Sequence, residues 1–167
     1  MSESDTTTRP GQVILSWWSV ALGDRSSGAQ KGLSARLRRA DDVAVLCEAP
    51  VHDLATRLNL RDGARIAGLA RLLAHIRQHG TPSLPRLLGE GDPPKMSRLR
   101  FERLMHARGA DLEAGLRRAL MMTGYAANVA HLGESYLFWA DATRMRWCFD
   151  YFGTIAPQPK MIEETSQ

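Results

Sequence analysis

The sequence predicts an all-α protein: a compact bundle of about eight helices arranged in two helical halves. Apolar residues recur every three or four positions along most of the chain, which is the spacing of amphipathic helices. No segment alternates apolar and polar residues between turns, and the Asp62-Gly63 pair lies between helical patterns rather than in a hairpin. Hydrophobic residues make up 44% of the chain, enough for a buried core and too many for a disordered protein.

Side chains suited to helix starts mark several of the predicted helices. Asp41, Ser97 and Asn128 are each placed to accept hydrogen bonds from the free amides of a first turn. Pro50 fits the first turn of another helix, where the missing N–H has no partner to lose. The predicted helices cover 11–22, 27–40, 42–48, 51–60, 62–79, 97–108, 111–124 and 127–152.

One long segment, 79–95, is rich in helix breakers, with four prolines and three glycines. A loop of this length is typical of either a plain connector or a binding or lid segment, and both interpretations stay open. The predicted organisation is one all-helical domain at 9–155, with an N-terminal half at about 11–79, a connector at 80–95, a C-terminal half at about 96–153, and flexible tails at 1–8 and 156–167.

Several classes of protein are disfavoured. No apolar run approaches the roughly 20 residues that span a bilayer, and the N-terminal MSESDTTTRPG lacks the apolar region of a signal peptide. We therefore expect a soluble, cytoplasmic protein with no membrane partner.

Cys47 and Cys148 stand in apolar contexts without CxxC spacing and are predicted to be buried free thiols.

Catalytic patterns are weak. His75 and His79 lie four residues apart, as metal ligands on one helix do, but the Glu of HExxH and a third ligand are missing. There is no GxxxxGK[ST] phosphate loop and no GxSxG nucleophile motif. The sequence therefore favours a binding or assembly protein without metal or cofactor over an enzyme.

The body of the protein is basic. Residues 9–155 carry 21 basic and 14 acidic side chains, and 19 of the 22 basic residues in the chain are arginine. Arginine suits bidentate contacts with phosphate, and a basic surface indicates a polyanionic partner. A coding bias toward arginine is the alternative explanation, and it stays open.

In the helix at 27–40, the basic residues lie away from the apolar stripe. Lys31 and Arg38 nearly eclipse on the face opposite that stripe, with Arg39 beside them. Arg36 borders the stripe, and Arg25 lies in the preceding turn. The residues predicted to face inward are Ala29, Leu33, Leu37 and Ala40.

Two helices of the second half repeat this arrangement. Arg100 and Arg103 share one side of the helix at 97–108 with Arg98 nearby, and Arg117 and Arg118 project from the next helix. The residues predicted to face inward are Phe101, Leu104 and Met105 in the first helix, and Leu112, Leu116, Ala119 and Leu120 in the second. Because three helices each expose arginines, the sequence favours a surface that binds the phosphate backbone of a nucleic acid.

The predicted helix at 127–152 is rich in aromatic residues, for which core packing is favoured over base stacking. Arg144 and Arg146 lie among them, and each requires an anion, an aromatic face or water there. The residues predicted to share one side are Val129, Leu132, Tyr136, Ala140, Thr143 and Trp147.

Blocks of sequence in a fixed order carry a family resemblance. GLSARLRRA, RFERLM, LRRAL, NVAHL and FWADATRMRWCFDYFG, together with Trp17-Trp18 in the first helix, resemble the small subunit of the type I-E CRISPR Cascade complex, the CasB family. The resemblance covers most of 12–153. It implies an all-helical, non-enzymatic subunit, two copies of which pack head to tail against the subunits that hold the guide RNA. It also implies that basic residues help to hold the target and displaced DNA strands of the R-loop.

The resemblance carries this nucleic-acid-binding role onto Arg38, Arg39, Arg98, Arg117, Arg118 and Arg144. The helical faces add Arg25, Lys31, Arg36, Arg100 and Arg103 to the predicted site.

Two other classes of function stay open. One is a helical DNA-binding transcriptional regulator, although the chain is poor in the Asn and Gln that read bases. The other is a protein-only assembly subunit whose arginines pair with acidic partner surfaces.

Overall fold

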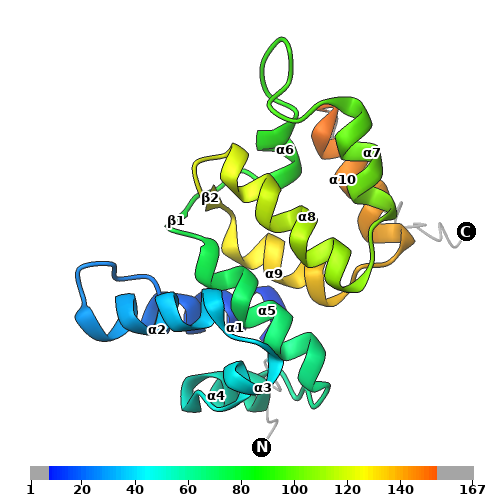
Figure 1. The fold of residues 1–167 in the computed structure, drawn as a ribbon. Helices are drawn as coiled ribbons and strands as arrows, with labels where there is room; N and C mark the ends of the chain where they lie inside the picture. The colour runs from blue at the N-terminus through cyan, green and yellow to red at the C-terminus, as the bar shows by residue number, and fades with distance from the viewer. Residues whose placement is uncertain (1–7, 154–167) are drawn as a thin grey trace, which may run out of the picture.

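The computed structural model describes residues 8–153 and confirms the all-α fold class (Figure 1). Apart from Thr8, the predicted tails lie outside the described residues. The helices are α1 (Pro10–Ala21), α2 (Gly28–Arg39), α3 (Asp42–Leu46), α4 (Ala49–Arg57), α5 (Gly63–His75), α6 (Leu84–Leu88), α7 (Arg98–His106), α8 (Gly109–Met122), α9 (Val129–Leu137) and α10 (Asp141–Tyr151). None of those helices is long and apolar enough to cross a membrane.

The predicted helix starts are confirmed. Asp41 accepts a hydrogen bond from the amide of Ala44 at 2.8 Å, and Ser97 and Asn128 cap α7 and α9 in the same way. Pro50 lies in the first turn of α4. The same chemistry starts three further helices, α2, α5 and α6, which are capped by Ser27, Asp62 and Ser83.

Two segments differ from the prediction, namely the end of the helix predicted at 62–79 and the breaker-rich segment at 79–95. The helix predicted at 62–79 ends at His75, and β1 (Gln78–His79) then pairs in parallel with β2 (Ala126–Ala127). This two-residue ladder was not predicted. The breaker-rich segment contains the short helix α6, and the loop that follows it stands out from the body at the top of Figure 1.

The single helix predicted at 127–152 is two helices. The break lies at Phe138, whose carbonyl accepts a hydrogen bond from the hydroxyl of Thr143 at 2.6 Å. The turn leaves Ala140 exposed, so its predicted inward position was wrong. Trp147 is fully buried as expected, but core packing was wrong for Phe138, which is 51% exposed. Phe149 and Phe152, on the outer side of α10, are also exposed.

Helix α5 lies at the centre of the fold (Figure 1). It packs against α2, α3 and α4 from the N-terminal half and against α8 and α9 from the C-terminal half. Its buried residues are Ile66, Ala67, Gly68, Leu69, Ala70, Leu72, Leu73 and Ala74. The basic helices α2 and α8 are therefore both held against the same central helix.

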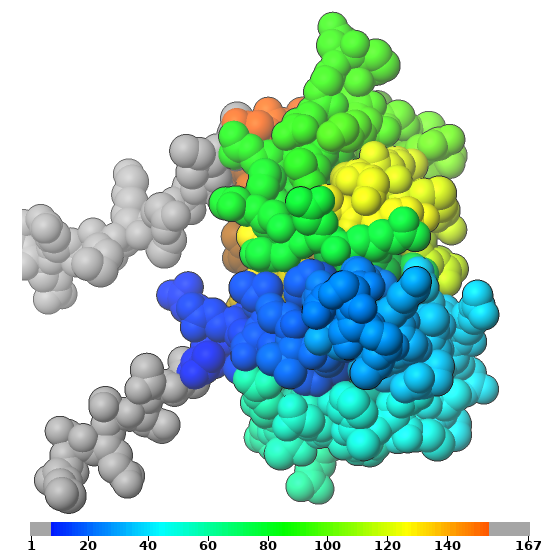
Figure 2. Space-filling model, turned by 90° about the vertical axis from the view of Figure 1, so that its left-hand side faces the viewer, coloured from blue at the N-terminus to red at the C-terminus, as the bar shows by residue number. Residues whose placement is uncertain are grey.

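The two halves also meet where α1 lies along α9. Gly133 permits this close approach, because a Cβ atom there would stand 2.7 Å from Cγ2 of Ile14. Figure 2 shows the blue and cyan surface of the N-terminal helices directly against the green and yellow surface of the C-terminal half. On the side of the first half, α1 is joined to α5 by a hydrogen bond. The indole N–H of Trp18 donates to the carbonyl of Leu73 at 3.1 Å.

The predicted burial was wrong for Cys47 and Ala29 and only partly correct for Cys148. Both cysteines are free thiols, but Cys47 is exposed and Cys148 only partly buried. Cys47 follows the short helix α3, whose Val45 is buried and whose Leu46 packs against the core. Ala29 is exposed because α2 packs through its later turns, where the Ser34 hydroxyl donates to the carbonyl of Ala74 at 3.0 Å. The other inward-facing residues predicted for α2, α7 and α8 are buried or packed against the core.

Candidate nucleic-acid interface

The basic helices α2 and α8 of the two halves both pack against α5, and His75 is the last residue of that helix. Burial lowers the pKa of His75 to about 4, with further lowering from Arg117 on α8, Arg38 on α2 and Arg25, against a raising contribution from Glu113. A histidine that feels three arginines from separate segments lies in a strongly positive region. The His75 cluster is defined as His75, Arg25, Arg38, Arg77 and Arg117.

Arg25 is held in the cluster by contacts within the protein. Its guanidinium donates to the hydroxyl of Ser34 at 2.7 Å and to the carbonyl of Ile76 at 2.8 Å. Burial lowers the pKa of Arg25, and the neighbouring charges of Arg38 and Arg77 lower it further. Arg25 therefore fastens the turn before α2 to the end of α5, and it contributes a fixed positive charge to the surface around it.

Arg77 belongs to the cluster but was missed by sequence reasoning. Its guanidinium carbon lies 4.5 Å from the centre of the Tyr125 ring, a cation–π distance. It follows the end of α5, in the segment that leads into β1, so no helical face marked it. The only signal in the sequence was its place next to the His75–His79 pair.

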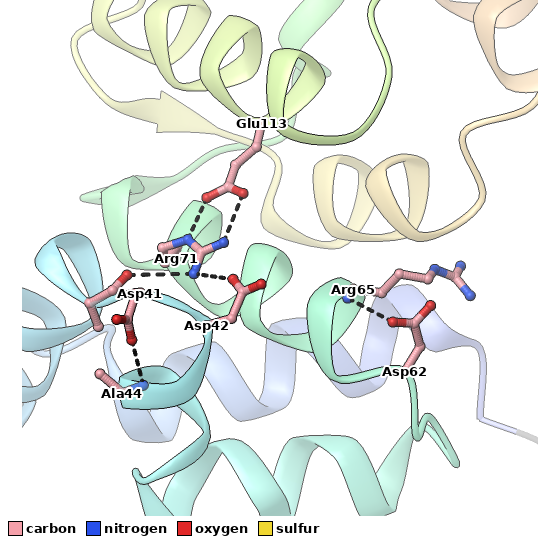
Figure 3. Close-up of polar contacts among 8 residues, drawn as sticks. Asp41, Asp42, Ala44, Asp62, Arg65, Arg71 and Glu113 are labelled. Carbon is pink, nitrogen blue, oxygen red and sulfur yellow. Dashed lines mark hydrogen bonds and ion pairs between the residues drawn. The ribbon is translucent and has the colours of Figure 1, made fainter.

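Arg71 of α5 lies between Glu113 of α8 and Asp42 of α3 and so joins the two halves (Figure 3). Its Nε and Nη2 donate to the two carboxylate oxygens of Glu113 on α8 at 2.6 and 3.0 Å. Its Nη1 lies 2.7 Å from Oδ1 of Asp42 on α3. These hydrogen bonds and charges raise the pKa of Arg71 against the opposing effect of burial. Glu113 precedes Arg117 by four residues, so the two residues lie on the same side of α8.

A second group of arginines lines a groove between α7 and α8, with a volume of about 790 Å³. Arg100 and Arg103 line it from α7, and Arg118 lines it from α8. These three residues form no ion pair with any residue among 8–153. The α7–α8 groove is defined by these arginines and by the apolar residues Met96, Leu99, Leu104 and Met122.

Three predicted site residues are engaged by carboxylates of the protein itself. Arg36 donates to Glu48 at 2.7 Å, and Arg98 lies 3.5 Å from Glu102. Arg144 pairs with Asp141 and lies over the indole ring of Trp139.

The predicted set thus divides by location. Arg25, Arg38 and Arg117 belong to the His75 cluster, and Arg100, Arg103 and Arg118 belong to the α7–α8 groove. Lys31 and Arg39 are exposed on α2. Arg36, Arg98 and Arg144 form ion pairs within the chain.

The histidine pair forms no metal centre in the part of the chain that the structure describes. No group of three His, Cys, Asp or Glu within 8–153 is arranged to hold a metal ion. Nδ1 of His79 instead accepts a hydrogen bond from the amide of Val129 at 3.1 Å, at the start of α9.

The comparisons with known proteins concern the fold. No protein-family model matches the sequence, and no curated protein matches it. Among solved structures, the fold is similar to that of a chain in the crystal structure of E. coli Cascade bound to a PAM-containing dsDNA target. The TM-score is 0.58, with 17% sequence identity over 84% of this chain and 91% of that chain. The fold of this protein therefore resembles that of a Cascade subunit.

Proposed function

We propose that this protein is the non-catalytic small subunit of a type I-E Cascade complex, of the CasB family, and that it binds the target and displaced DNA strands. One observation carries the proposal: α2 and α8, from opposite halves of the chain, both pack against α5, and Arg38 of α2 and Arg117 of α8 both lower the pKa of His75 at its end. The likeness to a Cascade chain supports the assignment of the complex.

The physical role follows from the energetics of R-loop formation. Exchanging a DNA duplex for an RNA–DNA hybrid is nearly balanced in free energy. A subunit that binds the expelled strand removes reannealing as a competing reaction and shifts the exchange toward the R-loop. Contacts with phosphates suffice, because the guide RNA already reads the sequence.

The partners in this proposal are the other Cascade subunits with their guide RNA, the two DNA strands, and a second copy packed head to tail. An apolar stripe on α10 favours protein contacts of this kind. Met145, Phe149 and Phe152 are 61%, 40% and 64% exposed and recur at helical spacing on one side of that helix. Tethering within a complex also increases the effective affinity of a weak nucleic-acid site.

The test is fluorescence anisotropy with labelled single-stranded DNA, duplex DNA and RNA, from about 50 to 200 mM salt. We expect binding that is independent of sequence and falls steeply with salt. The double variant Arg38→Ala/Arg117→Ala should bind more weakly. For single strands its log–log salt slope should be shallower by about 0.7 for each phosphate that the variant no longer neutralises.

The matched control is Arg57→Ala/Arg61→Ala, which removes the same charge near the start of α5, at the end opposite His75. It should bind nearly as well as the unchanged protein. Equal losses in both double variants would show a general charge effect and contradict a site at the His75 cluster. Loss of binding in neither variant would point the arginines toward protein partners.

A further inference from the structure

The α7–α8 groove has a chemical character that phosphate binding alone does not explain. Its sides carry Arg100, Arg103 and Arg118, but its floor is apolar. Met96 and Leu104 are each only 4% exposed and close the bottom, whereas Leu99 is 53% exposed at the rim. A surface that only followed a phosphate backbone would need no apolar hollow between its cations.

We propose that the α7–α8 groove holds an unpaired nucleobase of a single strand, while its arginines contact the flanking phosphates. This inference rests on the proposed nucleic-acid function and specifies which form of nucleic acid the site prefers. Bases stack on aromatic side chains and on guanidinium groups without regard to sequence, and pockets that hold an unpaired base also use apolar side chains. A volume of about 790 Å³ lies within the range of small-molecule sites.

The net charge of the residues that line the groove is positive, as expected for a site that binds a base and its flanking phosphates. Glu102 and Asp111 also line it, and Glu102 is already paired with Arg98 at 3.5 Å. His106 lies at the same rim. Three arginines beside two carboxylates give a modest positive excess, which suits a backbone with one charge per nucleotide better than a compact polyphosphate.

The groove adjoins the His75 cluster. Arg117 of the cluster and Arg118 of the groove are consecutive residues of α8. A strand held at the cluster therefore reaches the groove by crossing one helix. In a duplex the bases are paired and stacked inside, so only an unpaired base enters the groove. We therefore expect the cluster to bind both forms and the groove to add affinity for single strands alone.

The decisive experiment compares two single strands of equal length by anisotropy, one with bases and one made of abasic sites. Both carry the same phosphates, so a difference between them reports contacts with bases. We expect the strand with bases to bind about 5-fold tighter or more, the lower end of the effect of stacking one base. Duplex DNA should gain no affinity from the groove, because its bases are paired.

Leu99→Ala tests whether the groove is the source of this preference. The side chain is exposed at the rim, so the fold should tolerate the change, and a thermal melt checks this. The variant should lose the preference for bases and keep its affinity for the abasic strand. The matched control is Val43→Ala, a truncation of a 72% exposed side chain on α3, which should keep the preference.

The outcomes separate the two proposals. Equal binding of both strands with a steep salt dependence would overturn the base site and leave the proposed function standing. A preference for bases that persists in Leu99→Ala would place the stacking elsewhere and also overturn the groove. Absence of salt-dependent binding to any strand would overturn both proposals.

Discussion

Gly68 allows α5 to pack closely against Tyr136 of α9, because glycine has no Cβ atom. A Cβ atom there would stand 2.0 Å from the hydroxyl oxygen of Tyr136 and 3.0 Å from its Cζ atom. That hydroxyl is largely buried, which raises the pKa of Tyr136 to about 12, with a smaller contribution from Glu113. A side chain at position 68 therefore fits only if the Tyr136 ring or α5 shifts.

We expect Gly68→Ala to destabilise the protein. Overpacking of a core costs about 1–3 kcal/mol, and the better helix propensity of Ala offsets up to about 1 kcal/mol of that cost. Tyr136→Phe removes the closest atom, so Gly68→Ala should be less harmful in that background. Urea denaturation of both single variants and the double variant measures the coupling. Strictly additive effects would contradict the contact.

His75 makes stability depend on pH. Its pKa is about 4 in the folded protein and near 6.5 when unfolded, so the unfolded chain binds more protons between these values. The stability that His75 contributes is present above pH 6.5 and is lost as the pH falls toward 4. The melting temperature should therefore decline over this window.

The decline should be smaller in His75→Gln, which does not titrate. His131 contributes in the same direction, because burial lowers its pKa too, so His131→Gln is the parallel variant. Thermal melts at several pH values above about 4.5 measure the slope before most carboxylates titrate. An unchanged slope in His75→Gln would contradict the buried, positively surrounded histidine.

At the scale of single elements, capping determines where the helices start. Asp41 accepts from the amide of Ala44 at 2.8 Å at the head of α3. We expect Asp41→Ala to cost about 1 kcal/mol of unfolding free energy. Asp53→Ala is the control, because that carboxylate only approaches Arg57 at 4.0 Å on the surface of α4 and should matter less. Chemical denaturation compares the two, and equal effects would argue against the cap.

Local chemistry also explains which elements were predictable. The starts at Asp41, Ser97 and Asn128 were predicted correctly because a cap depends on residues adjacent in sequence. The break between α9 and α10 was missed because the aromatic pattern continues through it. The end of α5 was missed because β1 pairs with a segment from the other half, which no local pattern reveals.

Across the whole molecule, Arg71 is the main ionic contact between the halves. The Arg71 and Glu113 side chains are only 16% and 20% exposed. Removing one member of such a pair leaves the other charge poorly solvated. We expect Arg71→Met to cost about 2 kcal/mol, below the roughly 3–5 kcal/mol typical of fully buried pairs. It should also weaken binding to DNA, because the Arg71–Glu113 ion pair joins α8, which carries Arg117, to the N-terminal half.

Arg71→Met/Glu113→Met should recover much of the stability, since no charge is then left unpaired. The control is Arg36→Met, because the Arg36 side chain is 59% exposed and its pair with Glu48 should contribute little. Denaturation measures the stabilities, and anisotropy measures the binding. A double variant as unstable as Arg71→Met would show that packing, rather than the ion pair, holds the halves together.

The candidate site was only partly predictable from the sequence, because it depends on how helices from both halves pack together. Helical faces show that Arg38 and Arg117 are available to solvent, but their common electrostatic effect on His75 depends on how α2 and α8 pack on α5. Sequence alone also gave no sign that Arg36 would be neutralised by Glu48. Charge patterns identify basic helices, whereas tertiary packing decides which cations remain available.

The contact between α1 and α9 has a consequence for the order of folding. Helix α1 leaves the ribosome long before α9, the helix along which it packs, has been made. Until then the face of α1 that carries Ile14 lacks its partner, Gly133 of α9. Such distant contacts slow folding and prolong the exposure of apolar surface. The core closes only once α9 has been synthesised, so a chain truncated before α9 will be prone to aggregate.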